Sequence, residues 1–257
     1  MKTLCLLIST ALLSTHAFAE ANTYIRNGNI YSHQGQFFIE AGAVTGSELY
    51  KGQDNKTAIY VNGGYHGEDF NADITGINYR FFGDNRSAIN FSAFIVPNIG
   101  YRAEDANILT GMKDRNISGD LGINADLRLG KGTLSAKFQH DMTGVYNGYQ
   151  AGVTYYHPMN LGFADFVPFV GASYLGSDYV NYYTGVLTSE ATTKRPAYKG
   201  SSTFVYKAGY SLVVPLSEHL DLTQSTGYSR LGSSIADSPL IESKNQWVAS
   251  LGLTYSF

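Results

Sequence analysis

Cysteine is almost absent from the chain, since Cys5 is the only one among 257 residues. A fold stabilised by disulfides is therefore excluded. Charged residues are also few, at 15% of the chain against roughly 25% in ordinary soluble domains. The formal net charge of -3 does not support a strongly basic nucleic-acid binder, so we expect no nucleic-acid partner. Past the first segment no run of about 18 apolar residues occurs, which excludes a helical membrane protein.

The first segment has the three parts of a secretory signal peptide. Lys2 precedes an apolar run at residues 4–13, and the small-x-small motif Ala17-Phe18-Ala19 follows. The apolar run is too short to anchor the chain across a bilayer of about 30 Å. We therefore expect residues 1–19 to be removed when the protein is exported.

The rest of the chain is dominated by alternating apolar and polar residues, the pattern of β-strands. In Asp120–Leu129 the apolar side chains occupy the odd positions. The alternation resumes after residues 130–132, Gly-Lys-Gly, which predicts a β-hairpin. The final strand alternates from Trp247 and ends on Phe257. Such an ending resembles the C-terminal signal by which bacterial outer-membrane barrels are recognised for insertion.

The two faces of these strands favour a closed barrel in lipid. Inside a bilayer every backbone N–H and C=O must be paired within the protein, so an antiparallel sheet has to close on itself. The apolar face then meets hydrocarbon and the polar face lines a lumen. Aromatic residues near the run ends, such as Tyr155 and Tyr156, suit the membrane interfaces. The sequence therefore predicts an all-β fold, a transmembrane antiparallel β-barrel that follows a cleaved signal peptide.

Twelve strands are expected, or ten if the region Leu175–Val186 contributes none. The barrel would occupy residues 36–257, after an N-terminal periplasmic segment at residues 20–35. Pro168 requires a bulge or a local break, because proline cannot donate to a β-ladder. The expected strands are Gln36–Val44, Thr57–His66, Asp69–Phe82, Ser87–Pro97, Ser118–Leu129, Thr133–Met142, Tyr146–Tyr156, Asp165–Leu175, Val180–Val186, Ser202–Val214, His219–Arg230 and Gln246–Phe257.

A periplasmic C-terminus assigns each connection to one side of the membrane. Leu231–Asn245 and Leu187–Ser201 become outer loops. Asn98–Ile117 falls on the periplasmic side, where connections are normally short. Either the strand count is off by one, or this segment has a role facing the cell wall. The basic residues of the second outer loop, placed to meet lipopolysaccharide phosphates, are Lys194, Arg195 and Lys199.

The sequence gives little support for a catalytic site. His140 and Asp141 are the nearest approach to an acid–base pair, but neighbours on a strand point to opposite faces. Ser233 and Ser234 have no G-x-S-x-G context, and the histidines are scattered singly. We expect no catalytic residue, no metal site and no cofactor. Asp237 and Ser238 precede a proline, so they either shape an outer loop or bind a ligand there.

Several short motifs follow one another along the chain. They are Gly111-Met112-Lys113-Asp114-Arg115, Asp141-Met142-Thr143-Gly144 with Gly148, Asn181-Tyr182-Tyr183-Thr184-Gly185-Val186, Tyr228-Ser229-Arg230-Leu231, Ala236-Asp237-Ser238-Pro239-Leu240 and Tyr255-Ser256-Phe257. In this order and spacing they resemble the MipA/OmpV family of outer-membrane proteins, with a mild departure at Thr184.

The resemblance implies a non-enzymatic scaffold in the cell outer membrane. Members of the family include an adaptor that joins a murein lytic transglycosylase to a bifunctional penicillin-binding protein. No catalytic residue is attached to the motifs. By its length and predicted side, Asn98–Ile117 would contribute the contact, with Met112, Asp114 and Arg115 as candidates. A passive small-solute porin, a surface adhesin or antigen, and a barrel hydrolase are the alternatives, and the sequence names neither the partner nor the oligomeric state.

Overall fold

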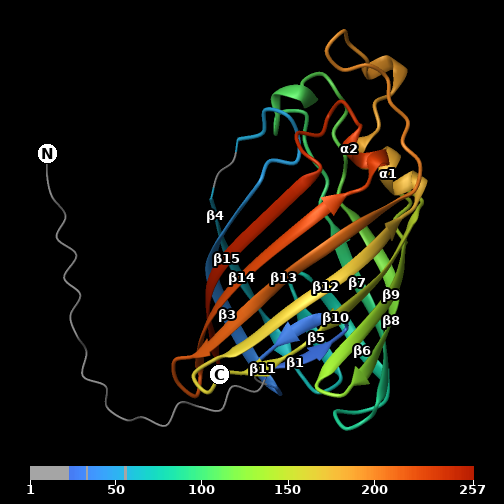
Figure 1. Cartoon of the computed structure of the whole chain (residues 1–257). Coiled ribbons are helices and arrows are strands. Elements are labelled where there is room, and N and C mark those ends of the chain that lie inside the picture. Colours follow the sequence, from blue (N-terminus) through green and yellow to red (C-terminus); the bar gives the residue numbers. More distant parts are fainter. Residues whose placement is uncertain (1–22, 33, 55–56) are drawn as a thin grey trace, which may run out of the picture.

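A computed structural model describes residues 23–32, 34–54 and 57–257, so the predicted signal peptide lies outside the described residues. Twelve antiparallel strands form one sheet that closes on itself (Figure 1). The closing pair joins β10 to β12, from Gln150 opposite Leu175 to Tyr156 opposite Phe169. The predicted transmembrane β-barrel is confirmed. The barrel strands are β3 (Gln36–Gly46), β4 (Ala58–His66), β5 (Phe70–Asp73), β6 (Gly76–Phe82), β7 (Ile89–Asn98), β8 (Ser118–Leu129), β9 (Gly132–Asp141), β10 (Tyr149–Tyr156), β12 (Asp165–Leu175), β13 (Thr203–Pro215), β14 (Leu220–Leu231) and β15 (Asn245–Ser256).

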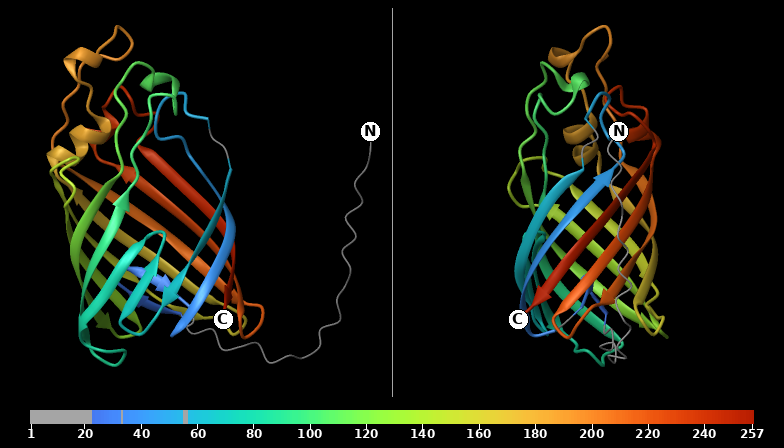
Figure 2. Two further views of the ribbon diagram at one scale, coloured as in Figure 1. Left: turned by 180° about the vertical axis from the view of Figure 1, so that it is seen from behind. Right: turned by 90° about the vertical axis from the view of Figure 1, so that its left-hand side faces the viewer.

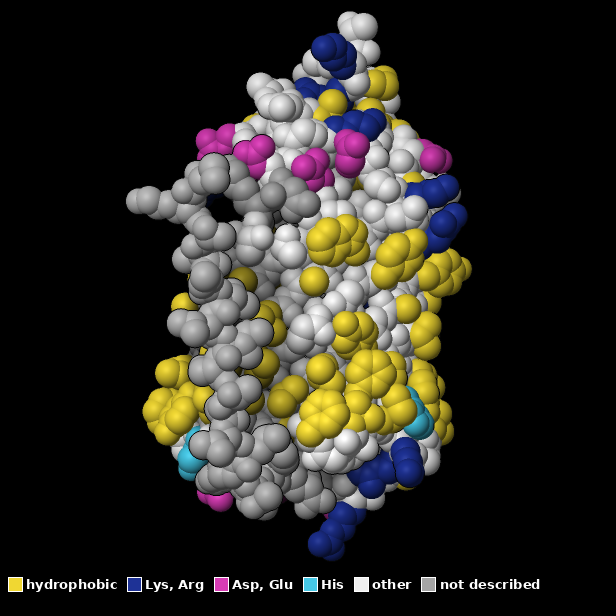
Figure 3. Space-filling model, turned by 60° about the vertical axis from the view of Figure 1, so that its left-hand side comes forward, with side chains coloured by type: hydrophobic (Ala, Val, Ile, Leu, Met, Phe, Trp, Pro, Cys, Tyr) yellow, Lys and Arg dark blue, Asp and Glu magenta, His cyan; other side chains and the backbone are white. Residues whose placement is uncertain are grey.

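The alternation of the sequence places apolar side chains outside and polar ones inside. On β8, Leu121 and Ile123 are exposed on the outer face, whereas Asp120 and Asn124 are buried in the lumen. Figure 3 shows that hydrophobic side chains gather on the barrel wall and that charged side chains gather at the two ends. This is the distribution expected of a β-barrel surrounded by lipid.

The two ends of the barrel differ in the length of their connections. The C-terminus and the short connections lie at one end, named here the turn end; long connections lie at the other, the loop end (Figure 2). Among the described residues, no helix is long and apolar enough to cross a lipid bilayer. The remaining elements are β1 (Tyr24–Arg26), β2 (Asn29–Tyr31), η1 (Asn107–Leu109), β11 (Met159–Asn160), α1 (Ser177–Thr184), η2 (Thr188–Glu190) and α2 (Ser233–Ala236).

Two strand predictions were wrong, and their errors cancel in the strand count. The expected strand Asp69–Phe82 is split into β5 and β6, because Asp73 accepts hydrogen bonds from the backbone N–H and the hydroxyl of Thr75 and so forms a turn. The expected strand Val180–Val186 is mostly the helix α1. The apolar residues of that segment also fit a helical period, and the helix buries Val180, Tyr183 and Thr184 beneath the loops.

The side predicted for Asn98–Ile117 was also wrong. The extra turn between β5 and β6 reverses the direction of every strand between it and α1 relative to the prediction. Asn98–Ile117 therefore lies at the loop end, where Gln53 forms a bridge with Ala106. Leu187–Ser201 and Leu231–Asn245 lie at the same end, as expected for outer loops.

Candidate functional site

A short hairpin, β1 and β2, lies inside the lumen near the turn end (Figure 1). Its turn is Asn27-Gly28, with positive φ angles of 49° and 68°, the conformation that an Asn-Gly two-residue turn favours. Residues 20–35 were expected to lie in the periplasm, so the position of this hairpin within the barrel differs from the prediction. We name residues 24–31 the lumen hairpin.

Lumen-facing groups of the barrel hold the lumen hairpin in place. Asp126 of β8 accepts a hydrogen bond of 2.7 Å from the backbone N–H of Asn27. The hydroxyl of Tyr156 on β10 donates to the carbonyl oxygen of Gly28 at 2.5 Å. Asn78 of β6 donates to the hydroxyl of Tyr31 at 3.0 Å. The lumen hairpin is thus bound to three strands of the part of the wall that runs from β6 to β10.

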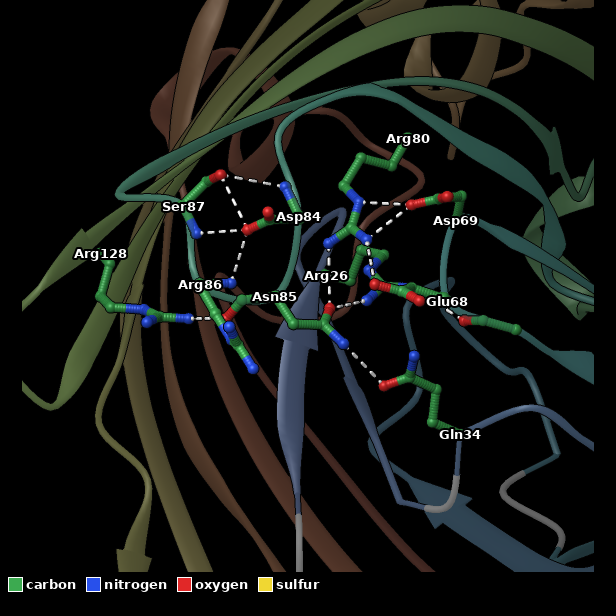
Figure 4. A network of polar contacts seen from close by, with 11 residues as sticks. Arg26, Gln34, Glu68, Asp69, Arg80, Asp84, Asn85, Arg86, Ser87 and Arg128 are labelled. Atoms are coloured by element: carbon green, nitrogen blue, oxygen red, sulfur yellow. Dashed lines mark hydrogen bonds and ion pairs between the residues drawn. The ribbon is translucent and has the colours of Figure 1, made fainter.

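A charged network joins the lumen hairpin to the β6–β7 turn at the turn end (Figure 4). The side-chain oxygen of Asn85 accepts hydrogen bonds from Arg26 at 2.8 Å and from Arg80 at 3.0 Å. Arg80 also pairs with Asp69 at 2.6 Å, while Arg26 donates to the carbonyl of Gly67. Both guanidinium groups are buried, so this network fixes the hairpin against the mouth of the barrel.

The β6–β7 turn is itself stabilised by Asp84. The backbone N–H groups of Arg86 and Ser87 donate to its carboxylate at 2.7 and 2.8 Å. These bonds, together with the Ser87 hydroxyl, lower the pKa of Asp84. The turn therefore holds its shape at neutral pH and presents Arg86 to solvent.

Three cavities touch the lumen hairpin, and one of them, of about 430 Å³, lies between Tyr24–Arg26 and the turns at the turn end. Of the two at the tip of the hairpin, the larger has a volume of about 380 Å³ and is lined by Glu40, His66 and Asp73 among others. The smaller, of about 120 Å³, is lined by Lys137 and Lys207. Both touch Gly28 and Asn29, so the tip of the lumen hairpin lies between polar spaces of the interior and occupies part of the lumen.

Removing the lumen hairpin is expected to open the lumen at the turn end. A variant lacking residues 23–31 should show a several-fold higher single-channel conductance in a planar bilayer than the intact chain, because the strands that surround the hairpin stay closed. Arg86→Met, an exposed change at the same end, is the matched control and should leave conductance unchanged. Equal conductance of the deleted and intact chains would contradict the proposed obstruction.

The long connections at the loop end form a small core of their own, named here the loop cap. Leu109, Met112, Val180 and Leu240 are buried in it, and Tyr50 donates to the carbonyl of Tyr183 at 3.1 Å. The packed residues come from four separate connections, so burial of apolar surface holds the loops together above the barrel.

A buried ion pair lies within the loop cap. Arg115 and Glu190 form a bidentate pair, with nitrogen–oxygen distances of 3.2 and 3.0 Å. Burial alone raises the pKa of Glu190, but hydrogen bonds from Arg115 and from the backbone N–H groups of Lys113 and Leu187 outweigh it. The pKa of Glu190 is therefore below its usual 4.5.

The loop cap is expected to loosen in acid. Because the pKa of Glu190 is lowered by folding, its contribution is complete at neutral pH and is lost as the pH falls below 4.5. Protease cleavage within residues 98–117 should rise as the pH falls from about 7 to about 3, measured with an acid-tolerant protease and corrected for its own pH profile. Glu190→Gln should remove most of that rise, and an unchanged pH dependence in this variant would contradict the assignment to Glu190.

The candidate residues of the sequence analysis all lie at the loop end. Met112 and Arg115 are buried in the loop cap, and Asp114 is exposed, where it accepts a hydrogen bond from the backbone N–H of Ala103. A contact of these three residues with a partner stays a prediction. They lie at the opposite end of the barrel from the C-terminus.

The outer-loop candidates fall into two groups. Lys194 and Lys199 are exposed. Arg195 is 4% exposed and donates to the carbonyls of Glu190, Ile108 and Thr110. The Ser238 hydroxyl donates to the carbonyl of Thr184 at 2.6 Å, and the backbone N–H of Asp237 caps α2. Arg195 and Ser238 therefore have structural roles within the loops, and the buried Arg195 is not placed to meet lipopolysaccharide as expected.

Two functional features were missed by sequence reasoning. The lumen hairpin carries one usable indication, the Asn27-Gly28 pair between two short alternating runs. Glu190 carries none, because its partner is 75 positions away. His140 and Asp141 lie on opposite faces of β9, as the alternation predicts. Within residues 23–32, 34–54 and 57–257, no three potential metal ligands come together.

Comparison with known proteins gives the family. The family model described as "MltA-interacting protein MipA" matches residues 39–257. The chain is 47% identical to "Outer membrane protein OmpV" of Vibrio cholerae and 46% identical to "Outer membrane protein Omp26La" of Vibrio anguillarum, in both cases over 100% of each chain. These relatives are named as outer-membrane proteins, and no enzymatic family is indicated.

Solved structures add little to this. The NanC porin superposes with a TM-score of 0.45 and 6% identity, covering 85% of this chain and 100% of its own, a similarity too low to bear on function. The full-length matches to named relatives and the family match over the whole barrel decide the question. The chain is an outer-membrane β-barrel that belongs to the MipA/OmpV family.

Proposed function

We propose that this barrel is an outer-membrane adaptor that holds a murein lytic transglycosylase, and through it a bifunctional penicillin-binding protein, beside the cell wall. The family description names an interaction with MltA. With the C-terminus and the short turns in the periplasm, the surface available to such an enzyme is the turn end. The observation that carries the proposal is the lumen hairpin, which lies in this mouth and is fixed there by Arg26, Arg80 and Asn85.

The turn end offers a charged surface of mixed sign. Arg86 and Lys131 are exposed on neighbouring turns, and Glu68 and Asp69 are half exposed beside Arg80. A partner that binds here would meet polar groups held by a rigid network, and such preorganisation reduces the entropy lost on binding. This replaces Asn98–Ile117 as the expected wall-facing contact, because that segment lies at the loop end.

Site-specific photo-crosslinking tests the adaptor proposal. A photoreactive residue at Arg86 or Lys131 should capture a purified lytic transglycosylase, whereas the same residue at Lys194 serves as the loop-end control and should not. Addition of the penicillin-binding protein should then give a ternary crosslinked species. Capture from Lys194 alone, or from none of the three positions, would contradict the proposal.

A passive pore is the second candidate, and the polar cavities of the lumen favour it. A pore requires the lumen hairpin to leave its place, whereas an adaptor requires it to stay. Conductance of the intact chain therefore separates the two functions. A stably open channel with residues 23–31 present would support the pore and count against the adaptor.

At the loop end, the proposed contact is with lipopolysaccharide. Lys194 and Lys199 are exposed on the connection that rises above the barrel, where phosphate groups of the outer leaflet attract ammonium groups. Arg195 takes no part, since it is buried and holds three backbone carbonyls.

A further inference from the structure

One part of the barrel wall is shorter than its neighbours. Strand β4 pairs with β5 only at Tyr65 and His66, and the pairing between β6 and β7 ends at Ile95. Among the described strands, none therefore pairs with the β5-facing edge of residues 58–63 of β4. Residues 96–98 of β7 pair with β8 on one edge and with no described strand on the other. Figure 2 shows the short β5–β6 hairpin ending partway up the wall. We name this gap the side notch.

The side notch lies within the lipid-facing band. Ile59 and Val61 of β4 are 78% and 71% exposed on the outer face, and Ile74 at the tip of the β5–β6 hairpin is 61% exposed. Unpaired backbone groups are costly at this depth because lipid offers no hydrogen bonds. Other groups must therefore satisfy or replace the unpaired backbone N–H and C=O groups at this edge.

Two local features reduce that cost. Pro97 lies on the unpaired part of β7 and has no backbone N–H to satisfy. The side-chain oxygen of Asn62 accepts hydrogen bonds from the backbone N–H groups of Gly63 at 2.8 Å and Ile74 at 3.3 Å. The sequence is thus adapted to a short hairpin at this position, which indicates that the side notch is a built feature of the wall.

The smaller lumen cavity lies directly behind the side notch. Thr75, from the tip of the β5–β6 hairpin, lines it together with Phe94 and Val96 of β7. Lys137 of β9 and Lys207 of β13 line the same cavity of about 120 Å³. The cavity therefore has apolar groups on the side next to the notch and two ammonium groups deeper in the lumen.

No hydrogen bond or ion pair of Lys137 or Lys207 occurs among the described residues. Asp120, whose Oδ2 accepts from Gln139 at 2.8 Å, attracts Lys137 from beyond ion-pair distance, and Asp126 accepts from the backbone N–H of Asn27 at 2.7 Å. Two ammonium groups that line one cavity without an ion pair can both donate charge-assisted hydrogen bonds to the same anion.

We propose that Lys137 and Lys207 bind the carboxylate or phosphate head of an amphipathic molecule, whose acyl chain extends past Phe94 and Val96 and through the side notch into the membrane. The head would receive charge-assisted hydrogen bonds from two ammonium groups. The chain would cover the unpaired edges of β4 and β7. This site is independent of the adaptor function at the turn end.

Binding of two probes to the folded barrel in detergent tests the site. Decanoate labelled with ¹³C at its carboxyl carbon supplies a head with a chain, and inorganic phosphate supplies a head alone; NMR line broadening gives both dissociation constants, with empty micelles as the blank. The double variant K137M/K207M should weaken decanoate binding by about tenfold or more. K51M/K244M, which removes two exposed lysines at the loop end, should bind as the parent does.

A second variant tests the route of the chain. Thr75→Trp places a large ring at the notch and should weaken decanoate binding several-fold while leaving phosphate binding unchanged. A heat-dependent shift in gel mobility shows that each variant is folded. Equal affinity for phosphate and decanoate with no effect of Thr75→Trp would identify a soluble anion and overturn the amphipathic ligand. Unchanged binding of both probes by K137M/K207M would overturn the site.

Discussion

Replacing Leu251 with arginine is expected to destabilise the folded barrel by about 2–4 kcal/mol, the cost of a cation at the lipid face near the middle of the membrane. Leu251 lies at the centre of β15 and is 51% exposed on the outer face. In a soluble protein the same change at an exposed position would shift stability by only about 0.5 kcal/mol. Urea unfolding in lipid vesicles, followed by the loss of the heat-modifiable band, measures the difference.

Two neighbouring changes control for this result. Leu251→Met keeps the residue apolar and should be nearly neutral. Ser250→Arg places the same charge on the adjacent residue, whose side chain faces the lumen, and should cost less than Leu251→Arg. Equal losses for both arginine variants would mean that the two faces of β15 do not meet different solvents, contrary to the barrel described above.

The second large effect is expected in the loop cap. Arg115→Met leaves Glu190 buried without its partner, and breaking such a pair costs about 3–5 kcal/mol. The loss should be local, because the ion pair joins two loops and no barrel strand. Hydrogen exchange should therefore speed up in residues 98–117 and 186–202, while the strands keep their protection.

Matched variants separate the pair from general effects of charge removal. The double variant R115M/E190M should recover much of the loss, since apolar replacement of a whole buried pair is often neutral. Arg102→Met breaks an exposed pair with Glu104, whose side chains are 74% and 76% exposed, and should have little effect. A loss in Arg102→Met as large as in Arg115→Met would contradict the importance of burial.

The fold could be predicted largely from the sequence because lipid imposes a simple rule on it. Apolar residues at every second position mark the outer face, and this rule placed β8, β9 and β15 within a few residues of their observed bounds. The rule fails in segments outside the membrane, because no lipid contacts one face of the chain there. Residues 177–184 lie in the loop cap, where one face of a helix buries Val180 and Tyr183. The alternation of apolar residues in this segment therefore did not indicate a strand.

Most of the candidate site could not be predicted, because its contacts join distant parts of the chain. Asn27 is 99 positions from Asp126, and Arg115 is 75 positions from Glu190. No local pattern encodes such pairs. The predicted side of Asn98–Ile117 was wrong because the turn at Asp73–Gly76 was not predicted. Each extra turn places the next connection at the opposite end of the barrel.

The most direct measurement of the central claim, a sheet closed on itself between β10 and β12, is a disulfide across that seam. Gly152 lies opposite Ser173, and a Cβ at Gly152 would lie 3.1 Å from the Ser173 oxygen. Cys5, the native cysteine, lies in the predicted signal peptide, so the processed variant G152C/S173C is expected to carry two thiols. We predict that they form a disulfide in the outer-membrane fraction, whereas G152C/V205C, one strand further, forms none. Free thiols in G152C/S173C, or a processed chain dissolved in the periplasm, would contradict the closed barrel.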